Sequence, residues 1–177
     1  MSDKENQDRP HRAATLGIHG RASGGRSPGS PVVPPIVQSA TFHWAKPEDG
    51  DLLYSRYGNN PNQLEVGQKI AALEGTESGI ALGSGMAATA MVFLALTKAG
   101  DHIVASSHLY GATRSLLLDE LPRRGIETTF VDPDVDHGWR EALRPETRII
   151  HIELPTNPTL RFFDPRPIAQ LAKEKGI

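Results

Sequence analysis

The sequence predicts an α/β fold in which a mostly parallel β-sheet is covered by helices on both faces, giving three layers. From residue 78 onwards, short apolar stretches that suit buried strands alternate with longer helical stretches. These helical stretches stop at or near glycine or proline, which are common ends of helices. The first strand also passes into its helix through a glycine-rich turn, a junction that is typical of α/β proteins.

Strands are expected at residues 78–82, 102–106, 127–131 and 148–153, because each is a short stretch with apolar or β-branched residues. Helices are expected over 62–74, 86–98, 113–124 and 166–175, with a short one near 139–143. A parallel sheet that stops after the last of these helices lacks its next strand and exposes an edge. The sequence is therefore interpreted as a fragment or a truncated gene product.

Two segments precede the predicted α/β domain of residues 62–177. Residues 1–31 are polar and then rich in Gly, Ser, Pro and Arg, a composition that buries too little apolar surface to fold, so we expect a flexible tail. Residues 32–61 carry Pro34 and Pro35 in an apolar stretch, which excludes a helix there and indicates an extended arm.

The arm ends in a loop that contains Tyr54, Arg56 and several Gly, Asn and Pro residues. An arginine held in a rigid loop can make paired hydrogen bonds to a phosphate or a carboxylate. Taken alone, Arg56 is more simply explained as a surface arginine.

The glycine-rich turn is the stretch Leu82-Gly83-Ser84-Gly85-Met86-Ala87-Ala88. A helix that starts here leaves backbone N–H groups without partners, and these donors bind a phosphate or another anion readily. The hydroxyl of Ser84 adds a further donor. The alternative is that the glycines only permit a tight turn from strand to helix.

Ligands of parallel α/β sheets bind beyond the carboxyl ends of the strands. Three segments follow the carboxyl ends of predicted strands and should lie together at one rim of the sheet: 84–86, 108–110 and 153–157. They offer an anion cradle (Ser84 to Met86), the aromatic ring of Tyr110 and the amide of Asn157. A flat, phosphorylated heteroaromatic cofactor needs these three features, although Tyr110 alone could be a packing residue and Asn157 alone a turn former.

The spacing Gly83-x-Gly85-x-x-Ala88 also fits the dinucleotide fingerprint, so a nicotinamide oxidoreductase is an alternative. That motif needs an acidic residue at the end of the second strand to hold the ribose. The second strand ends at 105–108 as Ala-Ser-Ser-His, and Asp101 lies before the strand. The dinucleotide interpretation is therefore disfavoured.

Composition excludes several classes of partner and site. A net charge of −2 and a pI near 6.4, without a concentrated basic face, do not support a nucleic-acid partner. The absence of cysteine excludes disulfides, thiolate metal sites and a cysteine nucleophile, and the histidines show no metal-binding spacing, so no metal is expected. No apolar run approaches the roughly 18 residues of a membrane span, and no signal-peptide core is visible, so we expect a cytoplasmic protein without a membrane partner.

The ordered motifs resemble the N-terminal part of the pyridoxal-phosphate-dependent enzymes of cysteine and methionine metabolism. This family includes cystathionine gamma-synthase, cystathionine lyases, O-acetylhomoserine sulfhydrylase and methionine gamma-lyase. The similarity runs from about Thr15 to Ile177. It includes the segments 34–36 (Pro-Pro-Ile), 39–42 (Ser-Ala-Thr-Phe), 54–56 (Tyr-Ser-Arg), 73–75 (Leu-Glu-Gly), 84–88 (Ser-Gly-Met-Ala-Ala), 109–111 (Leu-Tyr-Gly) and 153–158 (Glu-x-Pro-x-Asn-Pro).

The resemblance implies an incomplete large domain of the fold-type-I pyridoxal-phosphate-dependent transferase fold, similar to aspartate aminotransferase. It implies that Ser84, Gly85 and Met86 bind the cofactor phosphate. Tyr110 would stack on the pyridine ring and take part in catalysis by transferring protons. Asn157 would bind the ring hydroxyl oxygen.

The same resemblance assigns Tyr54 and Arg56 to the cofactor phosphate of a neighbouring subunit, which implies a homo-oligomer, expected as a dimer of dimers (a homotetramer). The implied activity is that of a transsulfuration-class lyase or transferase. It would catalyse elimination at the beta or gamma carbon, or replacement at the gamma carbon, of cystathionine or an O-acyl-homoserine amino-acid substrate.

Departures from the family pattern limit this expectation. The family's Schiff-base lysine comes later than residue 177, and none of the six lysines here is expected at the rim, so the chain alone is expected to be inactive. Ala112 stands where methionine gamma-lyases usually carry cysteine, which mildly disfavours that activity, and Arg114 is not assigned to substrate. The competing hypothesis is a non-catalytic remnant that only binds phosphate or pairs with full-length homologues.

Overall fold

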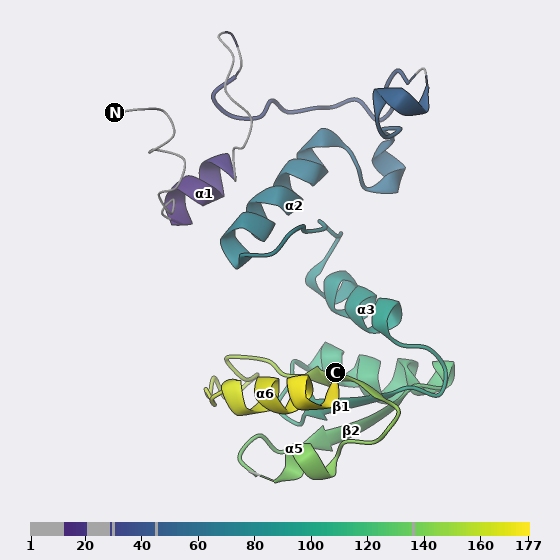
Figure 1. The fold of residues 1–177 in the computed structure, drawn as a ribbon, viewed down its shortest axis with the longest axis vertical. Helices are drawn as coiled ribbons and strands as arrows, with labels where there is room; N and C mark the ends of the chain where they lie inside the picture. The colour runs from purple at the N-terminus through teal and green to yellow at the C-terminus, as the bar shows by residue number, and fades with distance from the viewer. Residues whose placement is uncertain (1–12, 21–28, 30, 45, 136) are drawn as a thin grey trace. The chain divides into compact units, whose positions relative to one another are not determined.

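A computed structural model describes residues 13–20, 29, 31–44, 46–135 and 137–177 (Figure 1). The chain divides into two compact units, Met1–Ala81 and Leu82–Ile177. Most of the predicted tail lies outside the described residues. Within it, however, Ala13–His19 forms helix α1, which contacts helix α2 (Pro61–Glu74). We expected a flexible tail over residues 1–31, but residues 13–19 form a helix.

Helix α2 confirms the helix predicted over 62–74. It begins with Pro61 at its first position and ends at Gly75, whose left-handed backbone (φ 72°) suits glycine. The Asn60 side chain accepts a hydrogen bond from a backbone N–H of the first turn, and the Gln63 side chain accepts the N–H of Asn60. This reciprocal capping satisfies donors that a helix start otherwise leaves unpaired.

The arm before α2 is extended, as its prolines predict, and asparagines hold it in place. Asn62 accepts the N–H of Val37 at 2.7 Å and donates to the carbonyl of Pro35 at 2.8 Å. Thr41 pairs with Tyr54 through an isolated antiparallel bridge. The short 3-10 helix η1 (Pro47–Asp49) lies in the loop between Thr41 and Tyr54, and a second one, η2 (Ser55–Tyr57), follows directly after Tyr54.

The strand predicted at 78–82 is wrong, because the segment forms no ladder with any described strand. A strand needs a partner, and residues 78–81 belong to the unit of α2, whereas the sheet belongs to the other unit. Instead the segment packs its backbone on α2, where a Cβ built on Gly67 would overlap the carbonyl of Gly79. Both glycines are needed for this close approach.

The unit Leu82–Ile177 contains a three-stranded parallel sheet in the order β2-β1-β3, which confirms the predicted parallel α/β fold (Figure 1). The strands are β1 (His102–Ser106), β2 (Glu127–Val131) and β3 (Thr147–His151). The helices are α3 (Gly85–Leu96), α4 (Gly111–Ser115), η3 (Leu116–Glu120), η4 (Pro122–Arg124), α5 (Gly138–Glu141) and α6 (Arg166–Lys175).

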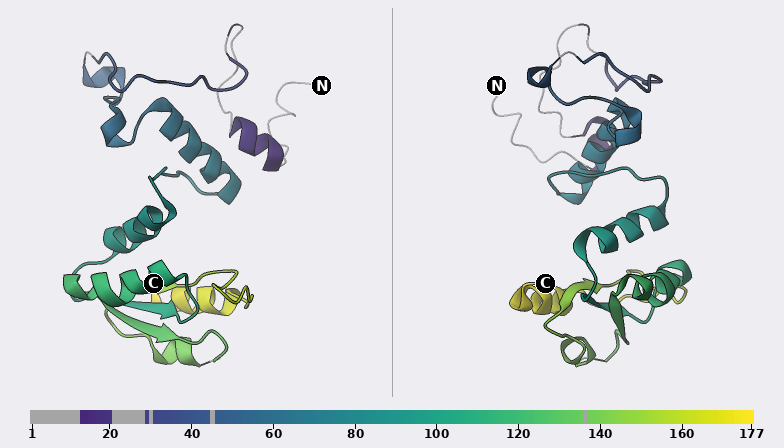
Figure 2. Two further views of the ribbon diagram at one scale, coloured as in Figure 1. Left: turned by 180° about the vertical axis from the view of Figure 1, so that it is seen from behind. Right: turned by 90° about the vertical axis from the view of Figure 1, so that its right-hand side faces the viewer.

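Helices lie on both sides of this sheet (Figure 2). Two hydrophobic clusters cover its two faces. On one face, Ile103 and Ala105 of β1 pack with Phe93 of α3 and with leucines of η3 and the turn after it. On the other face, Val104 packs with Trp139 of α5 and with Ile168 and Leu171 of α6. Alternate residues of one strand thus enter separate cores, as the period of a strand requires.

The helix predicted over 113–124 is instead an α-helical turn, a π-helical turn and a 3-10 turn in succession. The N–H of Leu121 donates to the carbonyl of Leu116 at 3.0 Å, a spacing of five residues. Pro122 explains the change, since its ring cannot continue a regular α-helix and it has no N–H to donate. Strand β3 ends at His151, two residues earlier than predicted, where the proline-rich loop begins.

None of the helices among the described residues is long and apolar enough to cross a lipid bilayer.

A buried histidine joins the three strands at the amino-terminal end of the sheet. The ring nitrogens of His102 lie 2.9 Å from the hydroxyl of Thr147 on β3 and 2.9 Å from the hydroxyl of Thr129 on β2. Burial lowers the pKa of His102 below its usual 6.5, and the Arg144 guanidinium lowers it further, while the carboxylates of Glu127 and Glu146 oppose the shift. The folded chain therefore favours the neutral imidazole.

Replacement of this histidine tests the pH dependence of stability. Because the pKa is lower in the folded than in the unfolded chain, the unfolded state binds more protons below about pH 6.5, and the free energy of unfolding falls as the pH falls. His102→Gln should reduce this slope, though not abolish it, since burial also lowers the pKa of His151. Urea denaturation between about pH 5 and pH 8, followed by the fluorescence of buried Trp139 in a Trp44→Phe background, measures it. A slope that is unchanged in His102→Gln would contradict the assignment.

The contact between Gly67 and Gly79 gives a second prediction. Gly67→Ala gains up to about 1 kcal/mol of helix propensity but places a methyl group on a backbone carbonyl, which costs about 1–3 kcal/mol. We expect a net loss of stability in urea denaturation followed by circular dichroism. Gly17→Ala in α1, where a Cβ meets nothing within 4 Å, should be neutral or stabilising. A Gly67→Ala protein as stable as the Gly17→Ala protein would show that the two backbones are not in contact.

Candidate functional site

The start of α3 forms the predicted anion cradle, Ser84 to Met86. Ser84 is the N-cap residue, with extended backbone (φ −163°, ψ 163°), and its Oγ accepts the N–H of Ala87 at 3.0 Å. Its hydroxyl hydrogen stays available for donation to a ligand. The N–H groups of Gly85 and Met86 have no hydrogen-bond partner within the described part of the chain. Ser84 and Gly85 are exposed, so these donors are open to an anion, and they fit a phosphate group.

Two contacts fix the cradle against the rest of its unit. The hydroxyl of Thr113, a buried residue of α4, lies 3.8 Å from the sulfur of Met86. Further along α3, the buried ring of Phe93 meets the ring of His151 edge to face, with centroids 5.1 Å apart. Burial lowers the pKa of His151, and the nearby Glu153 carboxylate partly opposes the shift. Helix α3 is therefore held at its start by α4 and further along by the end of β3.

Tyr110 lies at the same rim, after β1 and directly before α4. Its backbone N–H donates to Oε2 of Glu153, in the loop after β3, at 2.8 Å. The residue is 49% exposed, so its ring is accessible to a flat ligand that could stack on it. The structure thus confirms that the loops after β1 and β3 meet at the carboxyl end of the sheet.

Asn157 belongs to a loop that is organised around Thr156. Thr156 is fully buried, its hydroxyl accepts the N–H of Arg161 at 2.9 Å, and it lies 2.8 Å from the hydroxyl of Thr159. Its carbonyl accepts the N–H of Leu160. The loop also contains cis peptide bonds before Pro155 and Pro158. The Asn157 side chain is exposed and has no hydrogen bond to another described residue, so its amide is free to bind a ligand.

Tyr54 and Arg56, the other predicted cofactor-binding residues, belong to the unit Met1–Ala81. The Arg56 guanidinium lies 5.7 Å from the centroid of the Tyr54 ring, and the Tyr54 and Tyr57 rings pack edge to face. Arg56 is exposed. The two residues therefore form one aromatic and cationic group, and its contribution to the cofactor site stays a prediction.

Thr113, Glu153 and Thr156 were not singled out by the sequence analysis as site residues. Each acts on a neighbour in the fold through a hydroxyl or carboxylate, and single positions of these common residue types give no signal in a sequence. Arg114, by contrast, was left without a substrate role, and the structure shows its guanidinium 4.5 Å from the ring centroid of Phe130.

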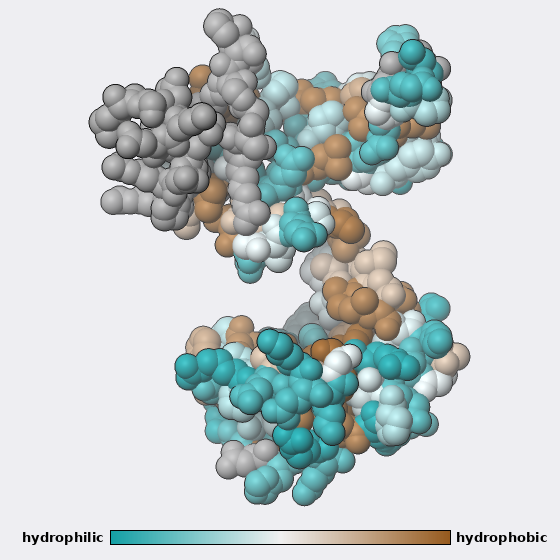
Figure 3. Space-filling model, in the orientation of Figure 1, coloured by the Kyte–Doolittle hydropathy of each residue, from teal (hydrophilic) through white to brown (hydrophobic). Residues whose placement is uncertain are grey.

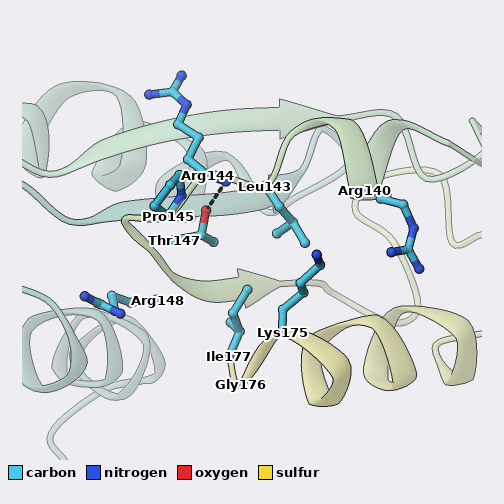
Figure 4. Close-up of a pocket in the computed structure, with 9 residues that line it drawn as sticks. All are labelled: Arg140, Leu143, Arg144, Pro145, Thr147, Arg148, Lys175, Gly176 and Ile177. Atoms are coloured by element: carbon cyan, nitrogen blue, oxygen red, sulfur yellow. Dashed lines mark hydrogen bonds between the residues drawn. The ribbon is translucent and has the colours of Figure 1, made fainter.

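A basic pocket of about 420 Å³ lies at the opposite end of the sheet, at the start of β3 (Figure 4). It is lined by Arg140, Leu143, Arg144, Pro145, Thr147, Arg148, Lys175, Gly176 and Ile177. Its three arginines are each paired with a carboxylate, from Glu174, Glu127 and Asp101. The charges are thus largely matched within the chain, and the pocket is separate from the rim. No group of three or more potential metal ligands occurs among the described residues.

Comparison with known proteins gives consistent matches. A family model described as Cys/Met metabolism PLP-dependent enzyme matches residues 14–177. Cystathionine beta-lyase MetC of Bacillus subtilis is 41% identical over 143 residues, covering 80% of this chain and 36% of that protein. Canavanine gamma-lyase of Pseudomonas canavaninivorans is 38% identical over 173 residues, covering 93% of this chain and 42% of that protein.

Among solved structures, cystathionine gamma-lyase from Lactobacillus plantarum, complexed with L-serine, has a TM-score of 0.84 and 34% sequence identity. The match covers 94% of this chain and 43% of that one. The chain therefore spans less than half the length of each of these relatives.

The buried hydroxyl of Thr156 gives a testable consequence for the Asn157 loop. Thr156→Val keeps the shape but leaves the N–H of Arg161 without its acceptor, which costs about 1–3 kcal/mol. We expect faster hydrogen exchange at the Arg161 amide and lower stability in urea. Thr156→Ser, which keeps the hydroxyl, should retain protection of that amide. If valine and serine variants exchange alike, the hydroxyl does not hold the loop.

Proposed function

The chain belongs to the Cys/Met metabolism PLP-dependent enzymes, and on that premise we propose that it provides the pyridoxal-phosphate-binding part of a lyase for sulfur-containing amino acids. The family, the fold class and the cofactor expected from the motifs are confirmed, and the nicotinamide alternative is set aside. The observation that carries the proposal is the exposed pair of unpartnered N–H groups at the start of α3, at the same rim as the half-exposed ring of Tyr110.

Each rim residue has one part in this proposal. The N–H groups of Gly85 and Met86, with the hydroxyl of Ser84, hold the phosphate through the helix start. Tyr110 offers its ring as a stacking surface and its hydroxyl as a proton carrier near the substrate. The side-chain amide of Asn157 donates a hydrogen bond to the hydroxyl oxygen on the pyridine ring of the cofactor. Pyridoxal phosphate, when bound, supplies an electron sink for the amino acid attached to it.

The substrate class follows from the relatives, which are named as lyases of cystathionine, canavanine and methionine. We propose elimination at the beta or gamma carbon of cystathionine, or replacement at the gamma carbon of an O-acyl-homoserine. We further propose that Tyr54 and Arg56 reach the phosphate of a neighbouring subunit, so that a homo-oligomer, a dimer of dimers, forms the working site. The extended arm tethered by Asn62 supports this reach.

The lysines of the unit Leu82–Ile177 lie away from the rim. Lys98 precedes β1, and Lys173 and Lys175 lie in the last turn of α6, beside the basic pocket at the other end of the sheet. Lys46 and Lys69 pair with Glu48 and Glu65 in the other unit. We propose that this chain binds the cofactor without covalent attachment and does not turn over substrate alone. A remnant that merely binds phosphate is the less favoured alternative.

A titration with pyridoxal phosphate, using a proline substitution at the first residue of α3, tests the proposal. Gly85→Pro removes one N–H donor but suits the first turn of a helix, and the extended backbone of Ser84 tolerates a following proline. We expect affinity for pyridoxal phosphate to fall about tenfold or more, the loss typical of a charge-assisted hydrogen bond. Gly85→Ala, which keeps the N–H, should bind like the wild type.

Two controls make this result specific. Pyridoxal, which lacks the phosphate, should bind the wild type and Gly85→Pro equally weakly. Borohydride reduction followed by mass mapping should find no stoichiometric adduct on a lysine. Equal affinity of the proline and alanine variants for pyridoxal phosphate would refute the cradle, and inorganic phosphate binding as tightly as the cofactor would favour the remnant.

A further inference from the structure

We propose that Glu153 is a positioning residue for Tyr110: its carboxylate holds the backbone at Tyr110 and thereby sets where the aromatic ring stands at the rim. The role of the ring itself rests on the proposed function, whereas the positioning stands on the contacts between these two residues. The key contact is the 2.8 Å hydrogen bond from the Tyr110 N–H to Oε2 of Glu153, which spans 43 residues of sequence.

The backbone on either side of Tyr110 is fixed by other contacts, so the Tyr110 N–H is the group that still needs a partner. Leu109 is buried in the core, and the carbonyl of Tyr110 accepts the N–H of Arg114 as the first bond of α4. Tyr110 itself has non-helical backbone (φ −54°, ψ 135°) and no side-chain cap, and Gly111 follows it. The orientation of the peptide between Leu109 and Tyr110 decides the direction of the Tyr110 Cβ. The Glu153 carboxylate is the acceptor that holds this peptide.

The carboxylate suits this task because of its charge and its place. A carboxylate accepts a backbone N–H more strongly than a neutral acceptor does. Glu153 is half-buried at the base of the loop that carries Asn157, and that loop is fixed by the buried Thr156. One short segment after β3 therefore presents Asn157 directly and orients Tyr110 from a second loop. The position of the Tyr110 ring relative to the Asn157 amide is thus set through Glu153.

Glu153 has no other hydrogen bond with the described residues. Replacement of its side chain therefore removes the contact with Tyr110 and no other hydrogen bond. Glu153→Ala removes the acceptor, whereas Glu153→Gln keeps an oxygen that can accept the same N–H without the charge. Glu141→Ala, at an exposed position on α5, is the matched control for loss of a carboxylate. Comparison of the alanine and glutamine variants tells the hydrogen bond apart from the charge.

The first measurement needs no cofactor. Hydrogen exchange at the Tyr110 amide is followed by NMR in the 177-residue chain and in its variants. Exchange of the Tyr110 amide should be about five- to tenfold faster in Glu153→Ala, the loss of about one hydrogen bond, and close to wild type in Glu153→Gln and Glu141→Ala. A Tyr110 amide that ignores all three substitutions would overturn the proposal.

The second measurement is a double-mutant cycle for pyridoxal phosphate binding. Glu153→Ala should weaken binding in the wild type but have no further effect in a Tyr110→Ala background, because the carboxylate acts through Tyr110. An equal loss in both backgrounds would mean that Glu153 touches the ligand or supports the fold, and would overturn positioning. If no variant binds the cofactor while the amide results hold, the proposed function of the chain fails and the positioning role stands.

Discussion

The unit Leu82–Ile177 depends on the complete burial of its central strand. All five residues of β1 are buried, and the strand pairs in parallel with β2 on one side and β3 on the other. Its backbone groups are satisfied by two neighbours while its side chains enter two separate cores. Because all three strands run in the same direction, their carboxyl ends meet at one edge. The loops after β1 and β3 are therefore adjacent, and Tyr110 can reach Glu153.

The rim offers neutral donors rather than cations to a ligand. The anion cradle consists of backbone N–H groups and a hydroxyl at a helix start, and none of the residues that form it is charged. The opposite end of the sheet carries four basic side chains around its pocket, but its arginines are neutralised by carboxylates of the same chain (Figure 4). Charge density alone would point to the pocket end of the sheet and not to the proposed site at the rim. The exposed N–H groups at the start of α3 have no partner among the described residues, and this is why we place the proposed anion site there.

Apolar surface on α3 shows how the helix relates to the rest of its unit. Phe93 is fully buried against the sheet, yet Met91, Val92, Leu94 and Leu96 are each at least 42% exposed. Figure 3 shows hydrophobic surface where α3 lies in Figure 1. The helix is apolar on nearly all sides, a pattern that belongs to a helix with neighbours around it. Its sequence was read correctly as helix because the apolar run has no breaker, but the run could not tell which side chain would face the sheet.

The sequence by itself determined the parallel α/β pattern, the extended arm and the helix start that forms the cradle, because strand period, proline geometry and glycine turns act locally. It also indicated Tyr110 and Asn157, since the ends of parallel strands share an edge. Only the tertiary structure decided that Gly79 packs on α2 and that residues 78–82 do not join the sheet, that Pro122 widens the helix before it, and that Glu153 and Thr156 hold the rim. These outcomes depend on partners that are distant in the sequence or on competition between local preferences. The pattern of residue types along one chain does not show which distant groups come into contact.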